Sequence, residues 1–208
     1  MEINFNSFHA WAWLIRGDVL KKLKRYDEAL ASYKEALNYS DKAITLGDQD
    51  LPVFFYRAIA ILGLNRWDEG IAALDNAFQR LEPDYETTLE DGDLIINNLF
   101  VNDSAIWKSR IASLIAVYEK HKSLSFLGQG IVRNIPALMS EMVSDKAART
   151  WLELWQEPTS NYEQFQIPMR LLNAAVRYKE TKGDRRVLLE LPIEERNLLE
   201  PLVSTKPE

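Results

Sequence analysis

The stretch from Trp13 to Ala36, WLIRGDVLKKLKRYDEALASYKEA, constrains the fold of this chain more than any other segment. Trp13, Gly17 and Leu20 are spaced i, i+4, i+7, which places a large residue, a missing side chain and an aliphatic residue on one helical face. A second such face follows a short basic segment, and its residues are Tyr26, Ala29, Tyr33 and Ala36. The pattern predicts two amphipathic helices that fold back on each other across a basic turn.

The same internal spacing recurs further along the chain. Its residues are Phe54, Ala58, Ile61, Trp67, Gly70, Leu74 and Ala77. Between the two copies the apolar face continues without a break to Ile44, Gly47 then offers a left-handed cap, and Pro52 suits the first turn of the next helix. We therefore predict helices at about 8–23, 26–46, 52–64 and 67–81, the second of them unusually long.

Both copies resemble the tetratricopeptide repeat, a helical hairpin of about 34 residues with large and small residues at fixed places. In the first copy Arg16 and Asp41 depart from the Leu and Pro of the family pattern. The resemblance implies an all-α fold, with hairpin repeats forming an α-solenoid over residues 1–83, continued by a C-terminal helical region. It also implies that the first helices of successive repeats line a concave groove that selects a protein partner.

The resemblance places eight residues on the wall of that groove. They are Trp11, Leu14, Asp18, Lys21 and Lys22 in the first repeat, and Phe55, Ile59 and Leu62 in the second. This half-apolar lining suits an amphipathic helix or an extended apolar segment. Where one branch of the family holds the C-terminal carboxylate of chaperones with Lys and Asn, this chain has Leu14, Asp18 and Tyr56, so we do not expect chaperone tails to bind.

Residues 84–101 read as an acidic loop or linker, and 102–208 as a helical C-terminal region. The stretch EPDYETTLEDGD, from Glu82 to Asp93, carries six carboxylates and no cation. Apolar residues at helical spacing from Trp107 onward are compatible with a degenerate third repeat. Two features argue against that repeat, because Ile111 stands where the family needs Gly or Ala, and His121–Lys122 is a poor turn signal.

The last third of the chain reads as further helices. Trp151 and Trp155 lie one turn apart, which marks either a core face or a docking face. We expect this helix to end before Pro158, and the only run that could form a strand, 186–191, has no partner run. The segments IVRNIPALMSEMVSDKAARTWLELWQ and LLELPIEERNLL resemble the tails of cyanobacterial repeat proteins, a resemblance that supplies no site residues.

Composition removes most classes of chemistry. The chain has no cysteine and two histidines, so thiolate chemistry is excluded and general acid–base catalysis has few candidates. A net charge of −6 opposes phosphate backbones, and the N-terminus lacks the basic-then-apolar pattern of a signal peptide. We expect a cytoplasmic protein with no membrane span, no nucleic-acid partner, no metal and no cofactor.

These observations favour a non-catalytic protein–protein interaction module or adaptor, which binds a peptide or helix of a partner in the concave groove. A structural or oligomeric subunit is the first alternative, in which the chain's own C-terminal helices cover the groove and self-association is possible. An enzyme or nucleotide binder is the second alternative. The sequence supplies no catalytic residue for it.

Overall fold

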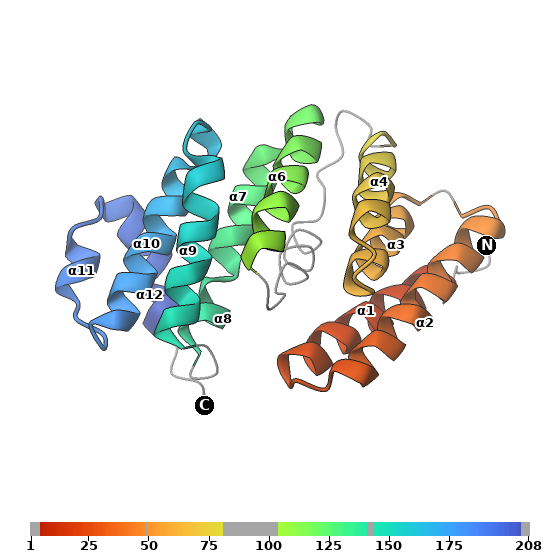
Figure 1. Cartoon of the computed structure of the whole chain (residues 1–208), viewed down its shortest axis with the longest axis horizontal. Helices are drawn as coiled ribbons and strands as arrows, with labels where there is room; N and C mark the ends of the chain where they lie inside the picture. The colour runs from red at the N-terminus through yellow and green to blue at the C-terminus, as the bar shows by residue number, and fades with distance from the viewer. Residues whose placement is uncertain (1–4, 49, 81–103, 141–143, 205–208) are drawn as a thin grey trace. The chain divides into compact units, whose positions relative to one another are not determined.

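The structure is a computed structural model that describes residues 5–48, 50–80, 104–140 and 144–204. Within these ranges the regular structure is helical and no strand occurs, so the chain is all-α (Figure 1). It divides into two compact units, Met1–Phe100 and Val101–Glu208. The predicted acidic linker at 84–101 lies outside the described residues.

The first unit contains two helical hairpins. They consist of α1 (Phe5–Lys22), α2 (Tyr26–Thr45), α3 (Leu51–Gly63) and α4 (Trp67–Phe78). Helix α2 is 20 residues long, and Gly47 after it has a φ of +89°. Helix α3 packs against α1, α2 and α4. Its run VFFYRAIAIL is apolar on nearly all sides because the helix is surrounded in this way.

The hairpins share one type of turn. After α1, Lys24 has a φ of +60° and the N–H of Arg25 donates to the carbonyl of Leu20 at 2.9 Å. After α3, Asn65 has a φ of +63° and the equivalent bond also forms. A left-handed residue with this bond spanning six residues is the Schellman helix end, which satisfies carbonyls that a helix terminus leaves without partners.

The same turn joins α6 to α7 in the second unit. Lys122 has a φ of +56°, and the N–H of Ser123 donates to the carbonyl of Tyr118 at 2.7 Å. The expectation that His121–Lys122 would turn poorly was therefore wrong. A lysine is a weak turn signal in sequence, but the helix-end hydrogen bonds offset the cost of its left-handed backbone.

Tyr33 of α2 joins the two hairpins. Its ring contacts Gly17 on α1 and Gly63 on α3, and a Cβ added at either glycine would lie 2.7 Å from a ring carbon. The side chain is 2% exposed. Because Gly17 and Gly63 have no side chains, the Tyr33 ring can fill the space where α1, α2 and α3 meet. The sequence pattern identified Gly17 but missed Gly63.

The second unit is built around α10. Its elements are α6 (Ser104–Lys120), α7 (Leu124–Arg133), α8 (Ile135–Met139), α9 (Asp145–Thr159), η1 (Glu163–Phe165), α10 (Gln166–Glu180), α11 (Arg186–Leu189) and α12 (Ile193–Ser204). Helix α10 packs against α7, α8, α9, η1, α11 and α12. Trp151 and Trp155 are fully buried, and the Trp155 ring stacks on Phe165 with centroids 6.5 Å apart. The two tryptophans therefore form core, which settles the alternatives that their spacing left open.

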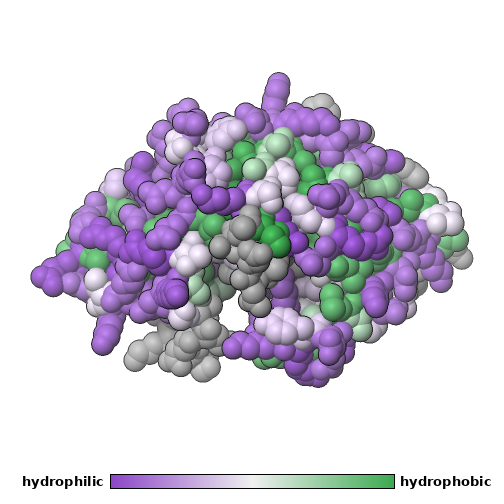
Figure 2. All heavy atoms as spheres, in the orientation of Figure 1, coloured by the Kyte–Doolittle hydropathy of each residue, from purple (hydrophilic) through white to green (hydrophobic). Residues whose placement is uncertain are grey.

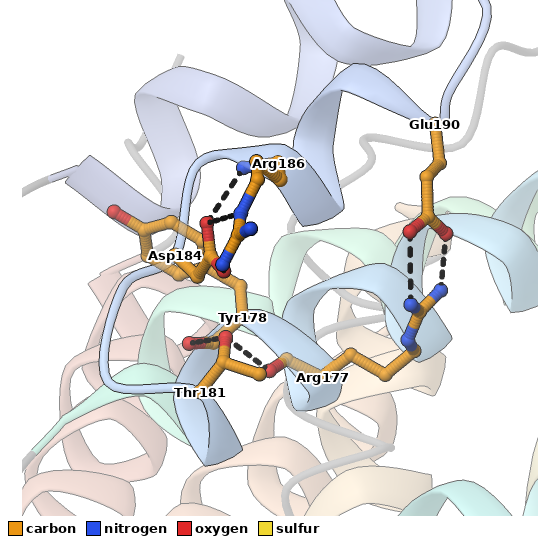
Figure 3. Close-up of polar contacts among 6 residues, drawn as sticks. All are labelled: Arg177, Tyr178, Thr181, Asp184, Arg186 and Glu190. Carbon is orange, nitrogen blue, oxygen red and sulfur yellow. Dashed lines mark hydrogen bonds and ion pairs between the residues drawn. The ribbon is translucent and has the colours of Figure 1, made fainter.

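Two local expectations in this unit differ from the structure. Helix α9 continues through Pro158 to Thr159, because a proline in the last turn forfeits only one helical hydrogen bond. Residues 186–189 form a helix instead of a strand. The Asp184 carboxylate accepts from the backbone N–H of Arg186 at 3.0 Å, which stabilises the start of that helix (Figure 3).

Candidate interaction surface of the first repeat

Most of the predicted groove wall is buried. Leu14, Asp18, Phe55, Ile59 and Leu62 are each 7% exposed or less. A Cβ added at Gly70 of α4 would lie 2.5 Å from Leu62 Cδ2, and the Phe55 ring meets Phe78 of α4 edge-on with centroids 5.2 Å apart.

This burial corrects the assignment of these five residues to an open wall. Phe55 and Leu62 pack into the α3–α4 hairpin, and Ile59 shares their helical face. The family pattern gives the spacing of the wall positions, but the large residues that this chain carries there serve its own core.

Three predicted groove residues keep solvent contact. Trp11 and Lys21 are half-buried and Lys22 is exposed. The Trp11 ring lies 6.0 Å from the Phe8 ring, and the Lys22 ammonium pairs with Asp18 at 2.9 Å. The accessible part of the predicted groove therefore lies on α1 alone.

The residues predicted to pack the repeats are nearly all internal. Gly17, Leu20, Ala29, Tyr33, Ala36, Ala58, Gly70, Leu74 and Ala77 are buried, and Trp13 and Trp67 are half-buried. Tyr26 is the exception at 58% exposed. It is the first residue of α2 and follows the turn after α1, where a helix hairpin is most open to solvent.

The opposite face of α1 carries exposed apolar side chains that the repeat pattern did not reveal. We define the α1 stripe as Phe8, Ile15, Val19 and Leu23, whose exposed fractions are 65%, 36%, 48% and 54%. Figure 2 shows hydrophobic residues at the surface over the part of the molecule that α1 and α2 occupy in Figure 1. The i, i+7, i+11, i+15 spacing of these residues could have revealed the stripe in the sequence, because it places a second apolar face on a helix whose other face packs in the core.

The surroundings of the stripe are basic. Residues 8–30 contain five cations and three carboxylates, a net charge of +2 in a chain whose total is −6. The Arg25 guanidinium makes two hydrogen bonds to Glu28, at 2.6 and 2.7 Å, and these hold the pKa of that carboxyl below its ordinary value. This local excess of cations suits an apolar partner surface that is bordered by acidic residues.

The histidines occupy structural positions. The His9 ring stacks on Tyr39 with centroids 5.1 Å apart, and His121 lies in the α6–α7 turn. In the part of the chain that the structure describes, no three His, Asp or Glu side chains gather as a metal site would need. Of the helices described, none is long and apolar enough to cross a bilayer.

Comparison with known proteins agrees with the hairpin geometry. The family model for the tetratricopeptide repeat matches residues 10–43, which cover most of α1 and α2. No curated protein and no solved structure matches the chain. Tetratricopeptide repeats commonly mediate protein–protein interactions and are generally non-catalytic. This match, together with the glycine–tyrosine packing of the first hairpin, identifies residues 10–43 as a tetratricopeptide repeat within an all-α chain.

Proposed function

We propose that this chain is a non-catalytic adaptor of the cytoplasm whose first repeat binds an amphipathic helix of a partner protein. The sequence alone predicts that the partner lies in the concave groove. The burial of Leu14, Phe55, Ile59 and Leu62 moves the proposed contact to the solvent side of α1, where Trp11 and Lys22 lie beside the α1 stripe.

The α1 stripe is the observation that carries the proposal. Four large apolar side chains at helical spacing keep between 36% and 65% of their surface exposed on one face of α1. Burying such side chains contributes about 25 cal/mol per Å² before ordering costs. A partner helix with apolar residues at i, i+3, i+4 and i+7 would cover the stripe, and acidic residues at its borders would meet the cations of residues 8–30.

The test uses two pairs of substitutions on exposed apolar residues. Ile15→Glu with Leu23→Glu disrupts the stripe, and Leu189→Glu with Ile193→Glu changes two exposed aliphatic residues of the second unit as a control. Because all four side chains are exposed, the far-UV circular dichroism of both variants should equal that of the wild type.

The readout is the set of proteins that immobilised full-length chain retains from a lysate of the source organism, identified by mass spectrometry. The proposal expects at least one protein that the wild type and the control retain and the stripe variant loses. Identical sets for the stripe variant and the wild type would refute it.

The burial of the groove wall also favours a second candidate function, a structural or oligomeric subunit whose groove is covered by its own helices. In that case a second copy of the chain would occupy the α1 stripe. Light scattering over a range of concentrations separates the two functions. A dimer that the stripe variant abolishes supports the second, and a monomer at every concentration removes it.

A further inference from the structure

The second unit contains an open cavity of about 570 Å³ between α7, η1, α10 and α12. Its apolar lining comes from Val132 on α7, Ile167 and Leu171 on α10, and Leu198 on α12. Ile167 and Leu198 keep 46% and 59% of their surface exposed. Binding pockets commonly measure about 300–1,000 Å³ and combine apolar walls with a few polar groups, so this cavity has the dimensions of a ligand site.

A glycine fixes the spacing of the cavity walls. A Cβ at Gly128 of α7 would lie 3.0 Å from Pro168 Cγ and 3.1 Å from the carbonyl oxygen of Gln164. Because a proline ring and a backbone oxygen cannot rotate away, a larger residue would push α10 and η1 away from α7. Gly128 therefore keeps α7 close to η1 and α10 next to the cavity.

Two guanidinium groups and one carboxylate line the cavity, those of Arg133, Arg170 and Glu163. Arg170 is held in place by Glu195, which accepts from Nε at 3.1 Å and from Nη2 at 2.6 Å. The Glu195 side chain is 9% exposed and that of Arg170 is 50% exposed. A buried carboxylate thus orients a solvent-accessible guanidinium, and two of its five N–H groups are used in doing so.

The remaining polar groups of the lining can both donate and accept hydrogen bonds. They are the hydroxyl of Ser125 and the side-chain amides of Gln129, Gln164 and Gln166. An extended polypeptide presents alternating N–H and C=O groups, which such amides can pair with. A small aliphatic acid would use the guanidinium and the apolar wall but would leave these amides to water.

We propose that this cavity binds an extended peptide segment in which a carboxylate side chain stands next to aliphatic ones. The carboxylate pairs with the Arg170 guanidinium, and the aliphatic side chains pack against Val132 and Leu198. The N–H groups of Arg170 that Glu195 does not occupy select the acidic group. This site belongs to the second unit and does not depend on the function proposed for the α1 stripe.

Binding is tested with four probes against the full chain by isothermal titration calorimetry. The peptide acetyl-Ser-Glu-Leu-Leu-Ser-amide should bind about ten-fold more tightly than its Gln-for-Glu and Gly-for-Leu versions, the loss expected for one charge-assisted hydrogen bond or one buried aliphatic side chain. Octanoate, the fourth probe, carries the same chemistry without a peptide backbone. Equal binding of the Glu and Gln peptides, or binding of octanoate alone, overturns the proposal.

Variants locate the site. Arg170→Gln combined with Glu195→Gln removes the ion pair without leaving a buried carboxylate unpaired, and should weaken peptide binding about ten-fold. The control is Arg177→Gln with Glu190→Gln, because Arg177 lies on the same helix as Arg170, also makes two hydrogen bonds to its glutamate, at 2.5 and 3.0 Å, and neither residue lines the cavity (Figure 3). The control should bind like the wild type.

Leu198→Ser provides a variant whose fold is not at risk, since the side chain is more than half exposed. It should weaken the Glu peptide several-fold and leave the circular dichroism spectrum unchanged. If both Leu198→Ser and the Arg170 variant bind like the wild type, the cavity is not the site. Ile15→Glu with Leu23→Glu should not alter peptide binding, which separates this site from the α1 stripe.

Discussion

Gly63 leaves almost no room for a side chain beside the Tyr33 ring. A Cβ built on its backbone lies 2.7 Å from Cδ1 and Cγ of Tyr33 and 2.8 Å from Cδ2. Carbon atoms in contact normally stand about 3.5–4.0 Å apart. Because Cγ is bonded to the Tyr33 Cβ, rotation of the ring cannot move it away. Gly63→Ala must therefore displace α3 from α2.

The size of this effect follows from two opposing contributions. Inserting a methyl group into a packed core costs about 1–3 kcal/mol. In a helix interior, alanine is more favourable than glycine by up to about 1 kcal/mol. At position 63 this gain is smaller, because Gly63 is the last residue of α3. We expect Gly63→Ala to lower the free energy of unfolding by about 2 kcal/mol. Gly17→Ala should cost about 1 kcal/mol or less, because it meets the outer ring edge, which can rotate, and lies inside α1.

Urea unfolding followed by far-UV circular dichroism measures both losses, and hydrogen exchange of α2 amides assigns the transition to the first unit. Ala31, exposed on α2, supplies the control, since Ala31→Gly reports helix propensity alone and should cost about 1 kcal/mol. The reasoning is refuted if Gly63→Ala is as stable as the wild type, or if Gly17→Ala costs more than Gly63→Ala.

Three further predictions concern single groups. Burial, and then the charge of Asp18, raise the pKa of Tyr33, whose hydroxyl has no hydrogen-bond partner among the described residues. Removing this hydroxyl by Tyr33→Phe should therefore leave the free energy of unfolding unchanged or raise it by up to about 1 kcal/mol in the same urea assay. A clear loss of stability would contradict this prediction. Lys122→Gly should stabilise by about 0.5–1 kcal/mol, because Lys122 has a left-handed backbone, whereas no gain would mean that the turn carries no strain. The hydrogen bond from Arg177 lowers the folded-state pKa of Glu190 below its unfolded value. This pair therefore stabilises the fold above the unfolded pKa, and its contribution disappears as the pH falls through the folded pKa. A carboxyl titration by NMR should give Glu190 a midpoint below that of an ordinary glutamate, and an ordinary midpoint would count against the pair.

Local sequence determined the helices and the type of hairpin. The spacing of Trp13, Gly17 and Leu20 is a property of one helix, and so is that of Ala29 and Tyr33, since side chains three, four or seven residues apart share a face wherever the helix is. The end of the long α2 near Gly47 was predictable for the same reason, because a left-handed glycine terminates a helix through its own backbone.

Only the tertiary structure decided which faces are covered. Phe55 and Leu62 have the same helical spacing whether they line an open groove or pack against α4, and the sequence of α3 cannot distinguish these environments. The contact between Gly63 and Tyr33 and the ion pair between Arg170 and Glu195 join residues 30 and 25 positions apart. Such pairs depend on how helices pack, because burial and long-range contact are properties of neighbouring elements and not of any one stretch of chain.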